Sequence, residues 1–179
     1  MTGGWRPGDR RPDRASMLRV NQAGEYGATR IYAGQLAVLG RSRPAAHQVA
    51  RMAAQEQNHL DRFNRLMADR RVRPTALQPL WSVAGFALGA ATALISEKAA
   101  MACTDAVETE IDRHYSEQLA ELGDDDPELA ADIAEFQAEE LEHRQTARDH
   151  GSQEAVAYPL LSATIRGFCR VAIQLSKRI

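Results

Sequence analysis

Six acidic and imidazole side chains recur in this sequence as two copies of one pattern. In each copy a Glu is followed, 31 or 32 residues later, by the motif Glu-x-x-His, and the copies are offset by 83 to 84 residues. The six are Glu25, Glu56 and His59 in the first copy and Glu108, Glu140 and His143 in the second. Four carboxylates and two imidazoles so arranged are the ligands of a paired-iron or paired-manganese site in a four-helix bundle. The pattern therefore predicts metal-dependent oxidation chemistry.

The spacing inside each motif suits one metal ion. Residues i and i+3 of a helix point the same way, so the Glu and His of one motif can hold the same ion. Four carboxylates balance the charge of two divalent ions, which makes burial of the whole group feasible. Carboxylate and imidazole donors without a thiolate favour iron or manganese. A single Glu-x-x-His arises by chance on polar helix faces, whereas a duplicated one with matched intervals is specific.

The residues around the two copies repeat as well, at a constant offset of 83. The matching positions are Tyr32, Gln35, Leu36, Ala37 and Leu39 in the first copy and Tyr115, Gln118, Leu119, Ala120 and Leu122 in the second. The sequence thus contains an internal two-fold repeat, and each half has the length of a helical hairpin.

Helix-forming residues dominate, and Gly- and Pro-containing segments separate the periodic stretches. We predict helices over residues 17–39, 45–69, 81–122, 127–150 and 153–177, with Pro159 in the first turns of the last helix or kinking it. The fold class is all-α: a four-helix bundle with an internal two-fold repeat of helical hairpins plus an additional C-terminal apolar helix. In each hairpin the lone Glu and the Glu-x-x-His motif are separated from the turn by similar numbers of residues. They should therefore lie at similar heights along the bundle.

Length and charge limit the alternatives. The 179 residues suit one domain, with residues 1–16 as a disordered tail and 17–179 as the helical domain. The tail lacks the apolar core of a signal peptide. A net charge of −2 gives no argument for nucleic acid, and two cysteines cannot build a disulfide framework.

The same helical periodicity separates the other polar residues into buried and solvated positions. The six candidate ligands lie on apolar stripes at three-and-four spacing, so they interrupt faces that should be buried. Five glutamates fall off these stripes and are predicted to be solvated: Glu110, Glu117, Glu121, Glu139 and Glu142. Tyr115 lies on a stripe, where core packing and a redox or substrate contact are both open. His114 is a candidate for a supporting contact behind the ligands, and Asp105 for orienting a ligand His.

Residues 75–96 contain no charged side chain. The helical part is short for a membrane span, so we predict an apolar helix that packs in the core or lies against a bilayer. The apolar C-terminal helix has the same two interpretations.

In these residues the sequence resembles a known family, the demethoxyubiquinone hydroxylases of ubiquinone biosynthesis. The matching blocks are residues 19–28, 30–35, Glu56-x-x-His59, 97–104, 106–108, His114-Tyr115, 139–143 and 167–172. The resemblance covers residues 17–179. Gln22 stands where the family usually has His, but that position is not a ligand.

The resemblance implies a ferritin-like fold and a di-iron centre, with two irons per chain, on the same six residues. It also implies hydroxylation of a demethoxyubiquinone-type lipid quinone by dioxygen, with electrons from NADH. Tyr115 is then a candidate catalytic residue beside the di-iron centre. Arg170 lies in a matching block and is a candidate contact for the anionic cofactor, since no GxGxxG fingerprint is present. A lipid quinone implies a peripheral protein on the membrane surface, at the cytoplasmic face of the cell's inner membrane, and in eukaryotes a lipid-presenting partner protein.

Three other functions share some of these features. A ferritin-like ferroxidase or iron store would use the same ligands, and a dinuclear manganese catalase-type enzyme would differ in its metal. A non-enzymatic helical scaffold on membranes would leave the repeat of all six residues without a cause.

Overall fold

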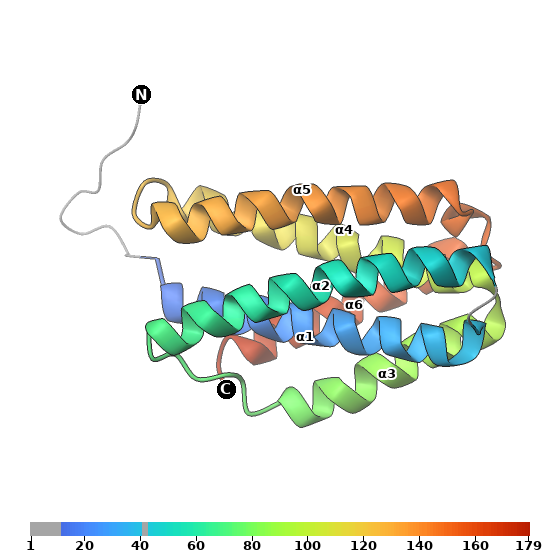
Figure 1. The fold of residues 1–179 in the computed structure, drawn as a ribbon, viewed down its shortest axis with the longest axis horizontal. Helices are drawn as coiled ribbons and strands as arrows, with labels where there is room; N and C mark the ends of the chain where they lie inside the picture. The colour runs from blue at the N-terminus through green and yellow to red at the C-terminus, as the bar shows by residue number, and fades with distance from the viewer. Residues whose placement is uncertain (1–11, 41–42) are drawn as a thin grey trace.

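The computed structural model describes residues 12–40 and 43–179, and the regular elements in these ranges are all helices. They are α1 (Arg14–Leu39), α2 (Pro44–Asp69), α3 (Gln78–Ile95), α4 (Glu97–Leu122), α5 (Pro127–Asp149), the short 3-10 helix η1 (Ser152–Glu154) and α6 (Tyr158–Ser176). Helices α1, α2, α4 and α5 run along one another as a bundle, and α3 and α6 pack on its outside (Figure 1). The predicted all-α four-helix bundle, built from two hairpins, is confirmed.

The first helix begins earlier than predicted. Most of the predicted disordered tail, residues 1–11, lies outside the described residues, but α1 already starts at Arg14. Asp13 caps this helix, because its carboxylate accepts a hydrogen bond of 3.0 Å from the backbone N–H of Ser16. The predicted helix start at residue 17 was wrong because Asp13 is equally compatible with being one more charge of a polar tail.

The predicted long helix over residues 81–122 was also wrong. The chain breaks at Ser96, whose backbone is extended (φ −175°, ψ 165°), and the Ser96 hydroxyl accepts a hydrogen bond of 3.0 Å from the N–H of Ala99. Neither Gly nor Pro marks this break, so the local sequence gave little sign of it. Helix α3 turns back here to pack along α1. Helices α3 and α4 therefore cannot form one continuous helix.

The C-terminal helix is shorter than predicted. It begins at Tyr158 and not at residue 153, because Ala157 adopts a left-handed conformation (φ 54°) after η1. Pro159 lies in the first turn of α6, which is one of its two predicted positions.

Glycines bring the backbones of α1 and α3 into direct contact. A Cβ added at Gly89 would lie 1.9 Å from the carbonyl oxygen of Ile31, and one added at Gly34 would lie 2.2 Å from that of Phe86. Such distances exclude any side chain. The contact fixes α3 along the flank of the bundle.

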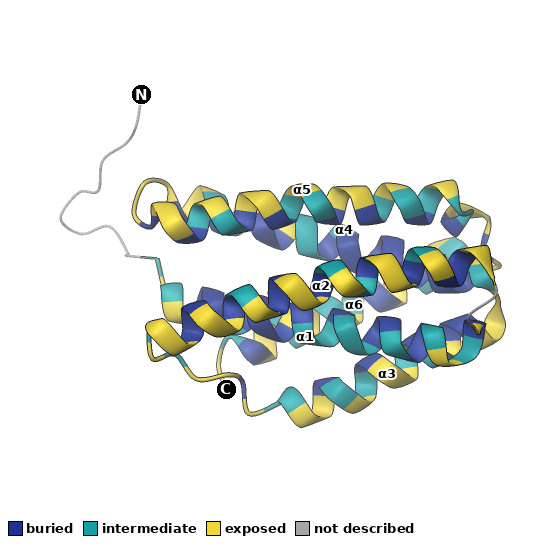
Figure 2. Cartoon of the chain, in the orientation of Figure 1, coloured by how far each residue is buried: buried dark blue, intermediate teal, exposed yellow. Residues whose placement is uncertain are grey.

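Apolar side chains fill the bundle on both sides of its middle. One cluster includes Val49, Met52 and Met101 near one end, and the other includes Phe63 and Leu129 near the opposite end. The helices are buried along their inner faces and exposed outside (Figure 2). The six polar residues of the repeat lie between the two clusters along their helices.

The glycine contact predicts a large effect of a single methyl group. Gly89→Ala should lower the free energy of unfolding by about 1–3 kcal/mol, because backbone must move to admit the Cβ. Gly167→Ala is the matched control: it lies inside α6 with nothing within 4 Å of the added Cβ, so it should stabilise by up to about 1 kcal/mol. Urea unfolding of both variants measures this, and equal stability would contradict the close α1–α3 packing.

Candidate metal centre

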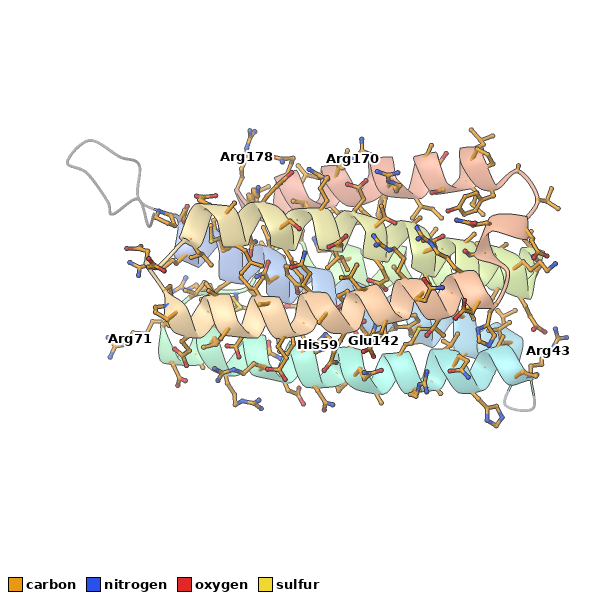
Figure 3. All side chains as sticks on the ribbon, turned by 90° about the horizontal axis from the view of Figure 1, so that it is seen from above. Arg43, His59, Arg71, Glu142, Arg170 and Arg178 are labelled. Carbon is orange, nitrogen blue, oxygen red and sulfur yellow. The ribbon has the colours of Figure 1, made fainter. Side chains whose placement is uncertain are left out.

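The structure brings all six residues of the repeat together in the middle of the bundle. Their ligand atoms form two groups, each with every atom within 4.8 Å of the others. The first group is Glu25, Glu56, His59 and Glu140, and the second is Glu56, Glu108, Glu140 and His143. None of the six is more than 2% exposed. His59 is seen between α2 and α5, at mid-length of the bundle (Figure 3).

Each helix of the bundle contributes in a way that follows the repeat. Helices α1 and α4 supply one carboxylate each, Glu25 and Glu108, and each carboxylate belongs to one group. Helices α2 and α5 supply the two Glu-x-x-His motifs. Their glutamates, Glu56 and Glu140, belong to both groups, so they are placed to bridge two ions. Each motif therefore does more than hold a single ion.

Unsatisfied polar atoms show that this donor set fits metal ions. Six buried atoms of the candidate ligands have no hydrogen-bond partner here: Glu25 Oε2, both Glu56 carboxylate oxygens, His59 Nδ1, Glu108 Oε2 and Glu140 Oε1. Each such atom costs about 1–3 kcal/mol if it stays unpaired. Cations among them would remove that cost. Carboxylate oxygen and imidazole nitrogen without thiolate suit iron or manganese.

Protonation is strongly perturbed within the cluster. Burial and the neighbouring carboxylates raise the pKa of Glu56 and of Glu108 well above the ordinary value. Burial opposes protonation of His59, but the Glu140 and Glu25 carboxylates, 3.3 and 3.4 Å from its Nδ1, raise its pKa to about 11. Burial also opposes ionisation of Glu140, yet His143 and His59 lower its pKa to about 2. Without cations the site therefore holds protons.

Two tyrosines donate hydrogen bonds to the cluster, and each donates to a carboxylate of the other repeat copy. The Tyr32 hydroxyl donates to Glu108 Oε1 at 2.9 Å, and the Tyr115 hydroxyl donates to Glu25 Oε1. Each tyrosine thus holds the carboxylate of the other half. Burial raises the pKa of both phenols, so they remain protonated donors. For Tyr115 the structure shows a polar contact as well as core packing.

The outer nitrogens of the two histidines have partners that the sequence did not suggest. His59 Nε2 lies 2.9 Å from Glu139 Oε2, and His143 Nε2 lies 3.2 Å from Gln55 Oε1. Glu139 was predicted to be solvated, yet its side chain is only 34% exposed and contacts a candidate ligand. It precedes the stripe residue Glu140 by one position, and helical periodicity could not show that α2 approaches it.

The position of Glu110 contradicts its prediction more clearly. Predicted to be solvated, it is wholly buried and accepts hydrogen bonds from Arg113, Arg166 and Arg170. Burial opposes its ionisation, but these three guanidinium groups lower its pKa to about 2. Arg170, the candidate cofactor contact, is therefore engaged with Glu110, at 2.9 Å from Oε1 and 3.1 Å from Oε2. Glu117, Glu121 and Glu142 are exposed, as predicted.

Two supporting candidates do not contact the cluster. Asp105 was predicted to orient a histidine. Its carboxylate instead accepts from Arg148, Ser152 and Tyr158 at 2.8–3.2 Å, and so joins α4 to the C-terminal region. The His114 ring lies 2.7 Å from Gln118, and burial, Lys177 and Arg113 lower its pKa to about 4.

An apolar cleft approaches the cluster from the side of α3 and α6. Its volume is about 630 Å³ with its open mouth included, and its lining comes from α1, α3, α4 and α6. Ala28, Ile31 and Val107 separate this cleft from a smaller cavity that is too narrow to hold a water molecule, because they line both. The smaller cavity is also lined by Tyr32 and Glu108. In this structure these three apolar side chains therefore stand between the cleft and the carboxylate cluster.

Known proteins are similar in sequence to this chain over most of its length. The sequence profile of the family described as "Ubiquinone biosynthesis protein COQ7" matches residues 13–176. A Rhodospirillum rubrum protein named 3-demethoxyubiquinol 3-hydroxylase is 54% identical over 97% of this chain and 82% of its own length. The Mus musculus NADPH-dependent 3-demethoxyubiquinone 3-hydroxylase, mitochondrial, is 53% identical over 90% of this chain and 76% of its own length. The Saccharomyces cerevisiae 5-demethoxyubiquinone hydroxylase, mitochondrial, is 44% identical over 91% and 77%.

Competition between protons and cations can be measured directly. Because the pKa values of Glu56, Glu108 and His59 are raised, binding of a divalent cation must displace protons, and the affinity should fall as the pH falls. Calorimetric titration with Co²⁺ at one pH, in two buffers of different ionisation enthalpy, should give different heats. Identical heats in the two buffers would show that no protons leave.

Proposed function

Because the chain belongs to the COQ7 family of ubiquinone biosynthesis proteins, we propose that it is a two-iron hydroxylase of a demethoxyubiquinone-type lipid. The observation that carries this proposal is the convergence of four carboxylates and two imidazoles into two overlapping groups of ligand atoms. Glu25 and His59 would hold one iron, Glu108 and His143 the other, and Glu56 and Glu140 would bridge the two. The family is one of oxidoreductases, and its named members hydroxylate the quinone ring.

When bound, the two irons supply the electrons and the coordination positions that activate dioxygen. In the net reaction one oxygen atom of O₂ becomes a hydroxyl group on the ring, and the other leaves as water with two electrons and two protons from a reductant. We expected NADH as the reductant, and the name of the mouse relative specifies NADPH. A reduced nicotinamide nucleotide is therefore the proposed electron source.

The apolar cleft is the proposed site of the quinone. Its lining matches an isoprenoid chain, and its inner end approaches Glu108 through Ala28, Ile31 and Val107. A ring at that end would lie beside the metal centre and away from bulk water. Tyr32 and Tyr115 keep the carboxylates oriented through their donated hydrogen bonds, so we assign Tyr115 a positioning role in the catalytic centre.

An exposed apolar patch on α3 and α6 supports a membrane-surface location. The patch comprises Leu80, Val83, Phe86, Leu94 and Ile95 on α3 and Leu160, Phe168, Val171 and Leu175 on α6. By length and composition α3 could cross a bilayer, but its close packing along α1 favours a helix that lies in the interface. Phe168 belongs both to the patch and to the cleft lining, so a lipid could pass from one to the other.

This patch also bears on location and on the alternatives. In a bacterial cell the matching location is the cytoplasmic face of the inner membrane, and a lipid-presenting partner protein would use the same surface. An iron-storage cage needs a polar outer surface, which this patch does not offer. A manganese catalase-type enzyme has the same ligands, so it is separated by metal analysis and by its substrate, hydrogen peroxide.

The metal and the activity can be tested together. Protein loaded with Fe²⁺ should contain about two irons per chain and should hydroxylate a short-tailed demethoxyquinone with NADH or NADPH and O₂. Glu140→Ala should lose most of the iron and the activity, whereas Glu142→Ala should keep both, because Glu142 is exposed on the same helix. Iron content unchanged in Glu140→Ala would refute the site, and turnover of hydrogen peroxide alone would favour the catalase-type enzyme.

Membrane binding has its own test. The double variant Val83→Asp, Val171→Asp places charge at two patch positions that are 70% and 57% exposed. It should reduce binding to anionic phospholipid vesicles by about tenfold or more, since two apolar side chains no longer enter the lipid. Leu141→Asp on α5, 39% exposed and outside the patch, is the control and should bind as the unaltered protein does. Vesicle flotation measures this, and equal binding of both variants would reject the patch.

A further inference from the structure

The two halves of the metal centre supply equivalent donor sets, and each histidine presents the same ring nitrogen to two carboxylates. His59 Nδ1 lies 3.4 Å from Glu25 and 3.3 Å from Glu140, and His143 Nδ1 lies 3.1 Å from Glu56 and from Glu140. In both histidines Nδ1 therefore faces the carboxylates, and Nε2 points outward. If nothing else differed, the two positions would bind metal ions with equal affinity.

The outer contacts break this equivalence. Positions 55 and 139 are related by the same offset of 84 residues that relates the two histidines, but one is Gln and the other is Glu. His59 Nε2 meets the carboxylate of Glu139 at 2.9 Å, and His143 Nε2 meets the amide oxygen of Gln55 at 3.2 Å. At the same place in each half, one histidine has a charged partner and the other a neutral one.

A third contact fixes the direction of these hydrogen bonds. Gln55 Nε2 donates to Glu139 Oε2 at 3.3 Å, so the amide oxygen of Gln55 is the atom that faces His143. With a cation bound, both imidazoles would then donate from Nε2 and present Nδ1 to the cation. Within the described part of the chain, no Lys or Arg is in ion-pair distance of Glu139, so its charge is not neutralised by a neighbouring cation.

A carboxylate behind an imidazole makes that imidazole a stronger ligand, and loss of such a partner typically changes metal affinity by about 10–100-fold. We propose, on the basis of the two-metal function above, that Glu139 makes the two positions unequal. The position of Glu25 and His59 fills first and holds its ion more tightly than the position of Glu108 and His143. The less tightly held ion is then the one beside the inner cavity, because Glu108 lines that cavity. Glu139 is thus a positioning residue that acts through His59.

The test uses metal affinity and needs no turnover. Metal-free full-length protein is titrated with Co²⁺ and followed by visible absorption and calorimetry. The unaltered chain should bind two ions in two steps whose dissociation constants differ by about tenfold or more. Glu139→Gln should weaken the tight step by about tenfold, bring the two steps together and still bind two ions. Glu142→Gln, exposed on the same helix, should leave both steps as they are.

Exchange of the two side chains gives the second arm. Gln55→Glu should tighten the weaker step, and the double variant Gln55→Glu, Glu139→Gln should restore two unequal steps in the reverse order. The order is read from His59→Ala, which should lose the tight step in the unaltered background and the weak step in the exchanged one. Thermal unfolding of each variant separates misfolding from a change in affinity. A single variant that folds like the unaltered protein is sufficient to test the proposal.

The titrations distinguish a failure of this inference from a failure of the two-metal function. Two equal steps in the unaltered protein, or a Glu139→Gln titration identical to that of the unaltered chain, would overturn the inequality and leave the two-metal function in place. Binding of fewer than two Co²⁺ ions by the unaltered protein would refute the two-metal function itself and this inference with it.

Discussion

Burial of charge is the constraint on which the rest of this structure depends. Four carboxylates and two imidazoles lie at the middle of the bundle with almost no exposure to solvent, and water cannot compensate them there. Some of this cost is met by protons, as the raised pKa values of Glu56 and Glu108 indicate. Divalent cations would meet more of it, because they also pair the carboxylate and imidazole atoms that have no partner here.

The surroundings of the centre differ sharply from one side to the other. Across α2 and α5 the contacts are polar, with Gln55, Glu139, Arg62 and Asp132 linked between the helices. On the side of α3 and α6 the lining is apolar, and the cleft leads inward through small and aliphatic side chains. In the proposed function, one side would tune the metal ligands electrostatically and the other would admit the lipid. This division is consistent with a duplicated hairpin whose two halves have acquired different neighbours.

Much of this was predictable from sequence because the repeat and the helical period act together. The convergence of the six candidate ligands, the hairpins and the bundle follow from spacing alone. The break at Ser96 did not, because a Ser cap is compatible with a continuing helix until packing against α1 decides otherwise. The burial of Glu110 was missed because its three arginine partners come partly from α6, more than 50 residues away. The contact of Glu139 with His59 likewise depends on how α5 faces α2. Contacts between helices were thus the part that one-dimensional periodicity could not supply.

The central claim, that these six residues hold a pair of metal ions, is tested most directly by anomalous diffraction at the iron absorption edge from crystals of the iron-loaded protein. The account predicts two anomalous peaks about 3.5–4 Å apart, one beside Glu25 and His59 and the other beside Glu108 and His143, with Glu56 and Glu140 between them. A map with iron only at surface carboxylates, or with no peak among these six side chains, would contradict it.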